Sequence, residues 1–223
     1  MTRIKNARCW VTASEFWILT CLCCLAQAST SEAQAPQKPE TLEQRVARGE
    51  PDAVMEAADK GRRDLIPAIE KYADIGSPME APRIWTRAAL AKLGVKKYLD
   101  ETVTELTTTN SELFAFYMRN GICPYPSQER RVACATERTQ ETAFKKLAYI
   151  RDPSTVKVVA AFLYSSESFH FAHDVPPWTA SGFAILTLRQ MVDNPPQVPV
   201  EYTGEQQIRA WQQWWEQNKD KYP

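Results

Sequence analysis

The sequence predicts an all-α fold, and three observations carry the prediction. Apolar residues recur every three or four positions through most of the chain after residue 40, which is the spacing of one helix face. Residues that start or end helices separate these runs at short intervals. The chain also has seven glycines against fifteen prolines, a balance that suits helices joined by proline-marked turns better than a twisted sheet.

The stretch 64–106 is the clearest case, because three consecutive segments in it each carry one apolar stripe. The stripes are Leu65, Ile66, Ile69 and Ala73; Trp85, Ala88, Ala89 and Leu93; and Tyr98, Leu99, Val103 and Leu106. Ser77 with Pro78 marks the expected start of the second helix, and Gly94 its end. Short helices of this kind cannot bury a stripe alone, so we expect them to stack on neighbours.

The remaining segments follow in order. Residues 41–60 predict two short helices separated by a turn at 49–52, with a stop at Gly61. Residues 111–118 suit a helical turn, 119–135 an irregular segment, and 136–150 a helix. Asp152 and Pro153 open another helix, 170–177 form a loop, and 178–192 and 205–221 form the last two helices.

The amino terminus is typical of a targeting segment. Arg3, Lys5 and Arg8 precede the short apolar run 16–26, and a small-x-small cleavage site ends at Ala28. Residues 1–28 are therefore predicted to be a signal peptide and 29–40 a flexible spacer, so we expect an exported protein, periplasmic or extracellular. An uncleaved membrane anchor that reaches back to Trp10 is the alternative.

Export affects the interpretation of the cysteines. Only Cys123 and Cys134 remain after residue 28, and two cysteines in an oxidising compartment most simply form a disulfide. Two free thiols or half of a metal site are the alternatives, although a zinc site would need further ligands at matched spacing.

The charges are balanced. The chain has 27 basic and 27 acidic residues, and 24 and 26 remain without the first 28 residues. This balance gives no field that would attract nucleic acid, and we expect no nucleic-acid partner. The sequence has no nucleophile elbow and no glycine-rich phosphate loop, so we expect no cofactor and no catalysis.

Three segments with a similar pattern suggest an internal repeat. ALAKL at 89–93, AFKKL at 143–147 and GFAIL at 182–186 occupy corresponding helical turns, 54 and 39 residues apart. A unit of roughly 40 residues with one insertion explains both separations and is a helical-repeat period.

These segments carry a resemblance to a known family. WTRAALAKLG at 85–94 with the following VKKYLDETVTEL, and AFKKLAYIRDPSTVKVVAAFL at 143–163, resemble helix junctions of HEAT repeats. The segment 204–222 resembles the Trp-rich last helix of exported bacterial HEAT-like proteins. The resemblance implies an α-solenoid of about four helical hairpins over residues 41–222, acting as a binding scaffold without catalysis of its own.

The last helix places Ile208, Trp211, Trp214 and Trp215 on one face. We interpret the tryptophans as the core of a capping helix that closes the open end of the repeat. An aromatic platform for a ligand is the alternative.

The insertion, at about residues 110–137, is the candidate partner-binding surface, because insertions in helical repeats lie on one face. Its candidate residues are Tyr117, Arg119, Tyr125, Arg130 and Arg131. The local excess of basic residues, which includes Lys145 and Lys146, suggests an acidic protein or an envelope component as the partner. A solvated helix face is the alternative.

A second candidate site holds the only two histidines of the chain. Glu167, His170, His173 and Asp174 lie within eight residues and could ligate a metal. The alternative is a plain loop between helices. The sequence thus favours an exported HEAT-like module that binds another protein. A metal-binding protein or metal-dependent enzyme, and a purely structural envelope component, are the other hypotheses.

Overall fold

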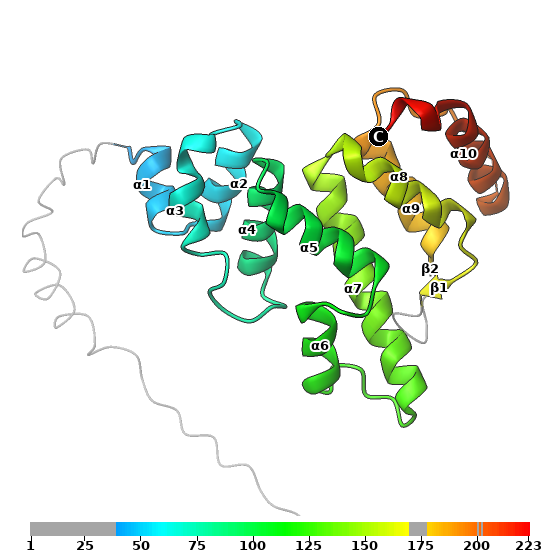
Figure 1. Cartoon of the computed structure of the whole chain (residues 1–223), viewed down its shortest axis with the longest axis horizontal. Helices are drawn as coiled ribbons and strands as arrows, with labels where there is room; N and C mark the ends of the chain where they lie inside the picture. The colour runs from blue at the N-terminus through cyan, green and yellow to red at the C-terminus, as the bar shows by residue number, and fades with distance from the viewer. Residues whose placement is uncertain (1–38, 170–177, 200, 202) are drawn as a thin grey trace, which may run out of the picture. The chain divides into compact units, whose positions relative to one another are not determined.

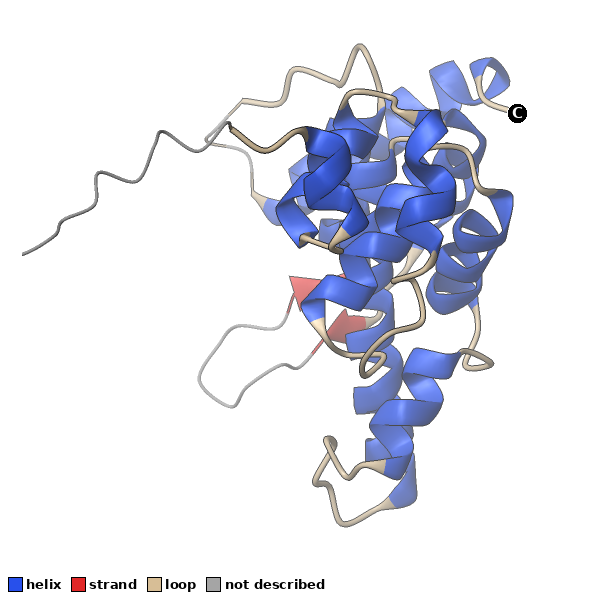
Figure 2. Cartoon of the chain, turned by 90° about the vertical axis from the view of Figure 1, so that its left-hand side faces the viewer, coloured by secondary structure: helices blue, strands red, loops and turns tan. Residues whose placement is uncertain are grey.

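A computed structural model describes residues 39–169, 178–199, 201 and 203–223, and 40–223 form one unit. The predicted signal peptide, and all of the predicted spacer except its last two residues, lie outside the described residues. The described part is almost entirely helical (Figures 1 and 2), which confirms the all-α prediction. Its α-helices are α1 (Leu42–Ala47), α2 (Pro51–Asp59), α3 (Ile66–Glu70), α4 (Ala81–Lys92), α5 (Lys96–Thr107), α6 (Glu112–Arg119), α7 (Gln128–Ile150), α8 (Val156–Ala161), α9 (Ala180–Met191) and α10 (Gly204–Asn218).

Short 3-10 turns and one strand pair complete this part of the chain. The 3-10 turns are Arg63–Leu65, Pro153–Thr155, Phe162–Tyr164 and Lys219–Lys221. Strands β1 (Ser168–Phe169) and β2 (Trp178–Thr179) pair antiparallel, with Ser168 opposite Thr179. The sequence does not predict this pair, and Trp178 and Thr179 belong to β2 rather than to the predicted helix 178–192.

Polar caps and glycines set the helix boundaries. Thr41 and Thr203 form capping boxes at α1 and α10, and the Ser127 side chain accepts a hydrogen bond from the Arg130 N–H at the start of α7. Gly94 ends α4 with φ +94°, a backbone conformation that glycine adopts without steric cost. The predicted stop of the second central helix is therefore confirmed.

Four helices contact one another in the order of the sequence. Helix α2 packs on α4, α4 on α7, and α7 on α9. The helices between them pack beside this row: α1 contacts α2 and α3, α5 contacts α4 and α7, and α8 and α10 contact α9.

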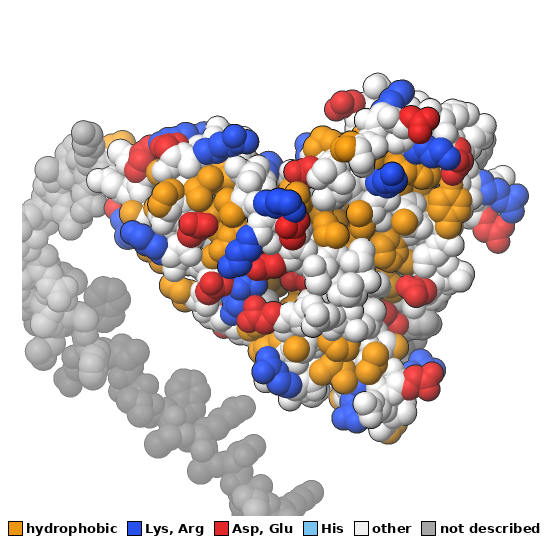
Figure 3. Space-filling model, in the orientation of Figure 1, with side chains coloured by type: hydrophobic (Ala, Val, Ile, Leu, Met, Phe, Trp, Pro, Cys, Tyr) orange, Lys and Arg blue, Asp and Glu red, His pale blue; other side chains and the backbone are white. Residues whose placement is uncertain are grey.

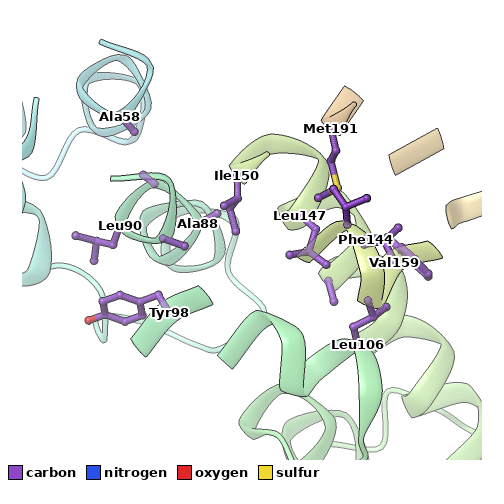
Figure 4. Close-up of a cluster of buried hydrophobic side chains, with 14 of the residues drawn as sticks. Ala58, Ala88, Leu90, Tyr98, Leu106, Phe144, Leu147, Ile150, Val159 and Met191 are labelled. Atoms are coloured by element: carbon purple, nitrogen blue, oxygen red, sulfur yellow. The ribbon is translucent and has the colours of Figure 1, made fainter. Parts of the chain in front are cut away.

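One hydrophobic core runs through this arrangement. It extends from Val46 in α1 to Trp215 in α10. Figure 4 shows a part of it, where Ile150 at the end of α7 lies beside α4 and Phe144 lies nearer to Val159 of α8. Helix α7 thus joins the core of the first helices to that of the last. No helix of the described residues combines the length and the apolar character needed to cross a membrane.

A second, smaller cluster lies apart from this core. Leu113, Tyr117, Cys123 and Ala135 form it, from α6, the connection that follows and the first turns of α7. We call residues 111–138 the lobe. Cys123 and Cys134 form a disulfide across it, with their Cα atoms 5.9 Å apart, as the sequence predicts.

Three sequence predictions are wrong in detail. Helix α4 begins at Ala81 and not at Ser77, with Glu80 at the N-cap position and Pro82 in the first turn. The segment 119–135 is irregular only to Ser127, because α7 begins at Gln128. Leu186 does not correspond to the buried Leu93 and Leu147: it is 41% exposed, while its neighbours Ile185 and Leu188 are buried.

Candidate functional site

A groove of about 950 Å³ lies along the row of helices α2, α4, α7 and α9, and each of the four contributes to its lining. Its apolar surface comes from side chains that the helices present beside the core. They are Met55 of α2, Trp85 of α4, Phe144 and Tyr149 of α7, and Phe183 and Leu186 of α9. Residues far apart in the sequence therefore meet in one depression.

Tyr149 connects three of the four helices. Its hydroxyl donates a hydrogen bond to the Met55 carbonyl oxygen over 3.3 Å, and Trp85 meets it edge to face with ring centroids 5.9 Å apart. The Lys92 ammonium lies 4.1 Å from the ring centroid and pairs with Asp59 at 2.7 Å. Burial, and then the charge of Asp59, raise the pKa of the Tyr149 phenol above its ordinary value, so the hydroxyl stays protonated and can donate this hydrogen bond.

The wall of the groove that α7 and α9 form is aromatic and partly exposed. Phe144 and Phe183 stack with their ring centroids 5.9 Å apart, and the Thr187 hydroxyl donates to the Phe144 carbonyl oxygen over 3.4 Å, joining α9 to α7. Leu186 presents an exposed aliphatic side chain next to them. Because burying a leucine side chain releases roughly 1.5–3 kcal/mol, this wall offers binding energy to an apolar group.

Charged residues lie at the edge of this apolar surface. Asp52 comes from α2, and Lys145 and Arg151 come from α7 and its end. Arg151 has φ +58° and is the single non-glycine residue with positive φ among those the structure describes. This residue is the left-handed C-cap of α7, and its backbone N–H donates to the Leu147 carbonyl oxygen, so the positive φ belongs to the end of the helix.

A buried ion pair behind the groove sets the rotation of α7. The Lys146 ammonium donates to the Glu105 carboxylate of α5, and the two side chains are only 4% and 10% exposed. The preceding residue, Lys145, is exposed and lines the groove. Successive helix residues point about 100° apart, so pairing Lys146 with α5 keeps Lys145, Ala148 and Tyr149 directed into the groove.

The residues predicted for partner binding lie in the lobe, and none of them lines the groove. Arg119, Arg130 and Arg131 are exposed, and Tyr125 is half-buried. Tyr117 is only 6% exposed, because α6 packs it into the core of the lobe. It is therefore not a surface contact, and burial raises the pKa of its phenol.

The second predicted site is mostly outside the described residues. His170, His173 and Asp174 lie there, while Glu167 is exposed just before β1. Within 39–169, 178–199 and 203–223, no three histidine, cysteine or acidic side chains converge as metal ligands.

The groove was not predicted from the sequence. Trp85 was predicted as a stripe residue and Leu186 as part of a recurring helical turn, although both line the groove. The helical period places both residues near the apolar stripes. It does not show which residues at the edge of a stripe remain uncovered by the neighbouring helix. The available signal was the large size of these two apolar side chains at the edges of the apolar stripes.

The described part of the chain is thus an all-α fold with an apolar groove lined by four helices. The chain matches no protein-family model, no curated protein and no solved structure.

Proposed function

We propose that the protein is an exported binding scaffold of HEAT-like kind, a short α-solenoid without catalysis of its own, which holds a segment of another polypeptide in its groove. The observation that carries the proposal is that α2, α4, α7 and α9 contact one another in sequence order and all line one apolar groove. Stacked helical pairs present extended surfaces of this kind to partners.

The dimensions favour a polypeptide. Packed helices lie 8–10 Å apart, so a row of four spans roughly 25–30 Å. An extended chain rises about 3.3 Å per residue, and a segment of about eight residues would follow the row. The aromatic surface at Trp85, Tyr149 and Phe183 then provides pockets for apolar anchor side chains, which supply most of the energy in such contacts.

A peptide selection tests this proposal. Random 12-residue peptides displayed on phage would be selected on the parent protein, and the enriched peptides synthesised and titrated by fluorescence anisotropy. We expect them to carry leucine or aromatic anchors and to bind the Leu186→Glu variant at least about tenfold more weakly. The substitution places a charge in apolar contact, and a tenfold loss corresponds to about 1.4 kcal/mol.

Ile75→Glu is the matched control. Ile75 is an aliphatic residue, 61% exposed, that does not line the groove. Enriched peptides should bind this variant as they bind the parent. Peptides that bind Leu186→Glu and the parent equally would show that the groove is not the binding surface.

A further inference from the structure

The lobe contributes no residue to the main hydrophobic core. Its four core residues form a cluster of their own, too small to be stable alone, and the disulfide from Cys123 to Cys134 compensates by joining its connection to α7. At its base, Glu112 accepts two hydrogen bonds of 2.8 Å from Arg83 of α4.

The lobe carries arginines without ion-pair partners. Arg119, Arg130 and Arg131 are exposed and Arg138 is half-buried, and none has a carboxylate within 4.0 Å among the described residues. In the first part of the chain, by contrast, Arg45, Arg62, Arg83 and Arg87 form ion pairs, and Arg63 is the exception there among the described residues.

Interactions within the described part of the protein do not explain the positions of these arginines. Arg130 and Arg131 lie in the first turn of α7, where the helix dipole disfavours positive charge. Of the three acidic residues in the lobe, Glu112 is held by Arg83 and Arg87, and Glu137 also has an interaction. Glu129, exposed in the first turn of α7, has no ion pair among the described residues and offsets one of the four arginine charges. The uncompensated charge of the lobe is therefore positive.

Arginine and apolar side chains occur together here. The segment 107–144 contains four arginines and no lysine. Phe114, Met118, Ile122 and Tyr125 pack around the small core and are each partly exposed. In Figure 3, hydrophobic side chains gather over α6 with basic side chains beside them.

We propose that the lobe is a docking surface for an acidic segment of a partner protein, separate from the groove. The arginine guanidinium binds a carboxylate with two parallel hydrogen bonds, which a lysine cannot do. Aromatic residues, methionine and arginine are the types enriched at protein interfaces, and their combination favours a polypeptide over a simple polyanion. The disulfide holds the two arginine-bearing segments together.

Fluorescence anisotropy with three probes tests the proposal at several salt concentrations. The probes are a labelled 12-residue peptide of alternating glutamate and tyrosine or leucine, its isostere with glutamine for glutamate, and labelled inorganic polyphosphate. We expect the acidic peptide to bind the parent protein and the isostere to bind at least about tenfold more weakly.

Exposed substitutions assign the binding to the lobe. The variant Arg130→Gln with Arg131→Gln should lose about tenfold or more in affinity for the acidic peptide, and Arg130→Lys with Arg131→Lys about threefold, because lysine keeps the charge but not the paired donors. Arg189→Gln is the matched control, since Arg189 is exposed on α9 and has no ion pair in the described part of the chain. Its affinity should equal that of the parent.

Three results would overturn the proposal. Equal binding of the acidic peptide and its isostere would exclude carboxylate recognition. Polyphosphate that binds as tightly as the peptide, with the lysine variant unchanged, would show unspecific charge attraction. Loss of binding in Leu186→Glu, with the arginine variants unaffected, would assign the peptide to the groove. Leu186→Glu tests the groove proposal with the groove peptides, and the arginine variants test the lobe proposal with the acidic peptide. A negative result for one proposal therefore leaves the other undecided.

Discussion

Two adjacent lysines of α7 have opposite environments. Lys145 is exposed and pairs with Glu141 one turn away at 2.6 Å, while Lys146 is buried and pairs with Glu105 of α5. Removing one partner of a buried pair leaves the other charge uncompensated. We therefore expect Lys146→Met to lower the free energy of unfolding by about 3–5 kcal/mol, measured by urea denaturation at pH 7.

The neighbouring residue provides the control for this prediction. Lys145→Met removes an exposed pair and should change the free energy of unfolding by about 0.5 kcal/mol or less. The double variant Lys146→Met with Glu105→Leu should regain most of the lost stability, because it leaves no buried charge. Equal stability of Lys146→Met and the parent protein would contradict the assignment of a buried pair.

Residue burial could be predicted where a stripe is wide and uninterrupted. The stripe residues Ile69, Ala88 and Leu106 are fully buried, and so is Trp211. Trp214 is only partly buried, and its indole N–H donates to the Asn194 carbonyl oxygen. Lys146 could not be distinguished from Lys145, because its partner lies 41 residues away and only the packing of α5 on α7 brings it close.

At the scale of the element, the lobe depends on its disulfide. The small cluster of Leu113, Tyr117, Cys123 and Ala135 supplies little burial energy. A disulfide across so short a loop stabilises by about 3 kcal/mol in the chain-entropy model. Replacing both cysteines by alanine should therefore loosen α6 and the first turns of α7, and leave the rest of the chain folded.

Amide hydrogen exchange measures this difference residue by residue. We expect protection to fall by about two orders of magnitude for amides of the lobe, as a loss of about 3 kcal/mol implies. Amides near Leu147, in the C-terminal half of α7 that packs in the main core, should keep their protection. An equal loss in both halves of α7 would mean that the lobe and the main core unfold together.

The elements themselves were predicted well where capping signals and apolar periodicity agree. Helices α4 and α5 lie within one to four residues of the predicted bounds. The start of α7 could not be predicted from periodicity, because its first turns face the small core of the lobe with the small residues Cys134 and Ala135, and Val132 is their one large aliphatic residue. The pair of β1 and β2 has only two residues in each strand, too few for an alternating pattern.

At the scale of the whole molecule, the order of the helices explains the groove. Tandem amphipathic helices predict stacking, and the contacts of α2, α4, α7 and α9 follow the order of the sequence. The depth and position of the groove depend on crossing angles and on side chains such as Tyr149 that bridge helices. These are long-range properties, and no local pattern encodes them.

The same arrangement implies that residues 110–137 can be removed. The Gln140 side-chain amide donates to the Leu106 carbonyl oxygen over 3.2 Å, so the two ends that flank this segment lie side by side. We expect that replacing residues 110–137 by a short glycine-serine linker leaves the main core folded. Circular dichroism should show cooperative thermal unfolding, and the groove peptides should retain their affinity while the acidic peptide no longer binds.

The loss of stability expected from this excision comes mainly from Arg83. Its guanidinium is largely buried and loses Glu112, which should lower the free energy of unfolding by about 1–3 kcal/mol. In the excised chain the guanidinium keeps only Asp74, at 3.9 Å, and the Gly76 carbonyl oxygen. Adding Arg83→Met removes this weakly paired charge and should restore part of that stability, whereas the same substitution in the full chain should destabilise. An excised chain that unfolds without cooperativity, with or without Arg83→Met, would show that the lobe belongs to the main core and would contradict its separation into an independent binding surface.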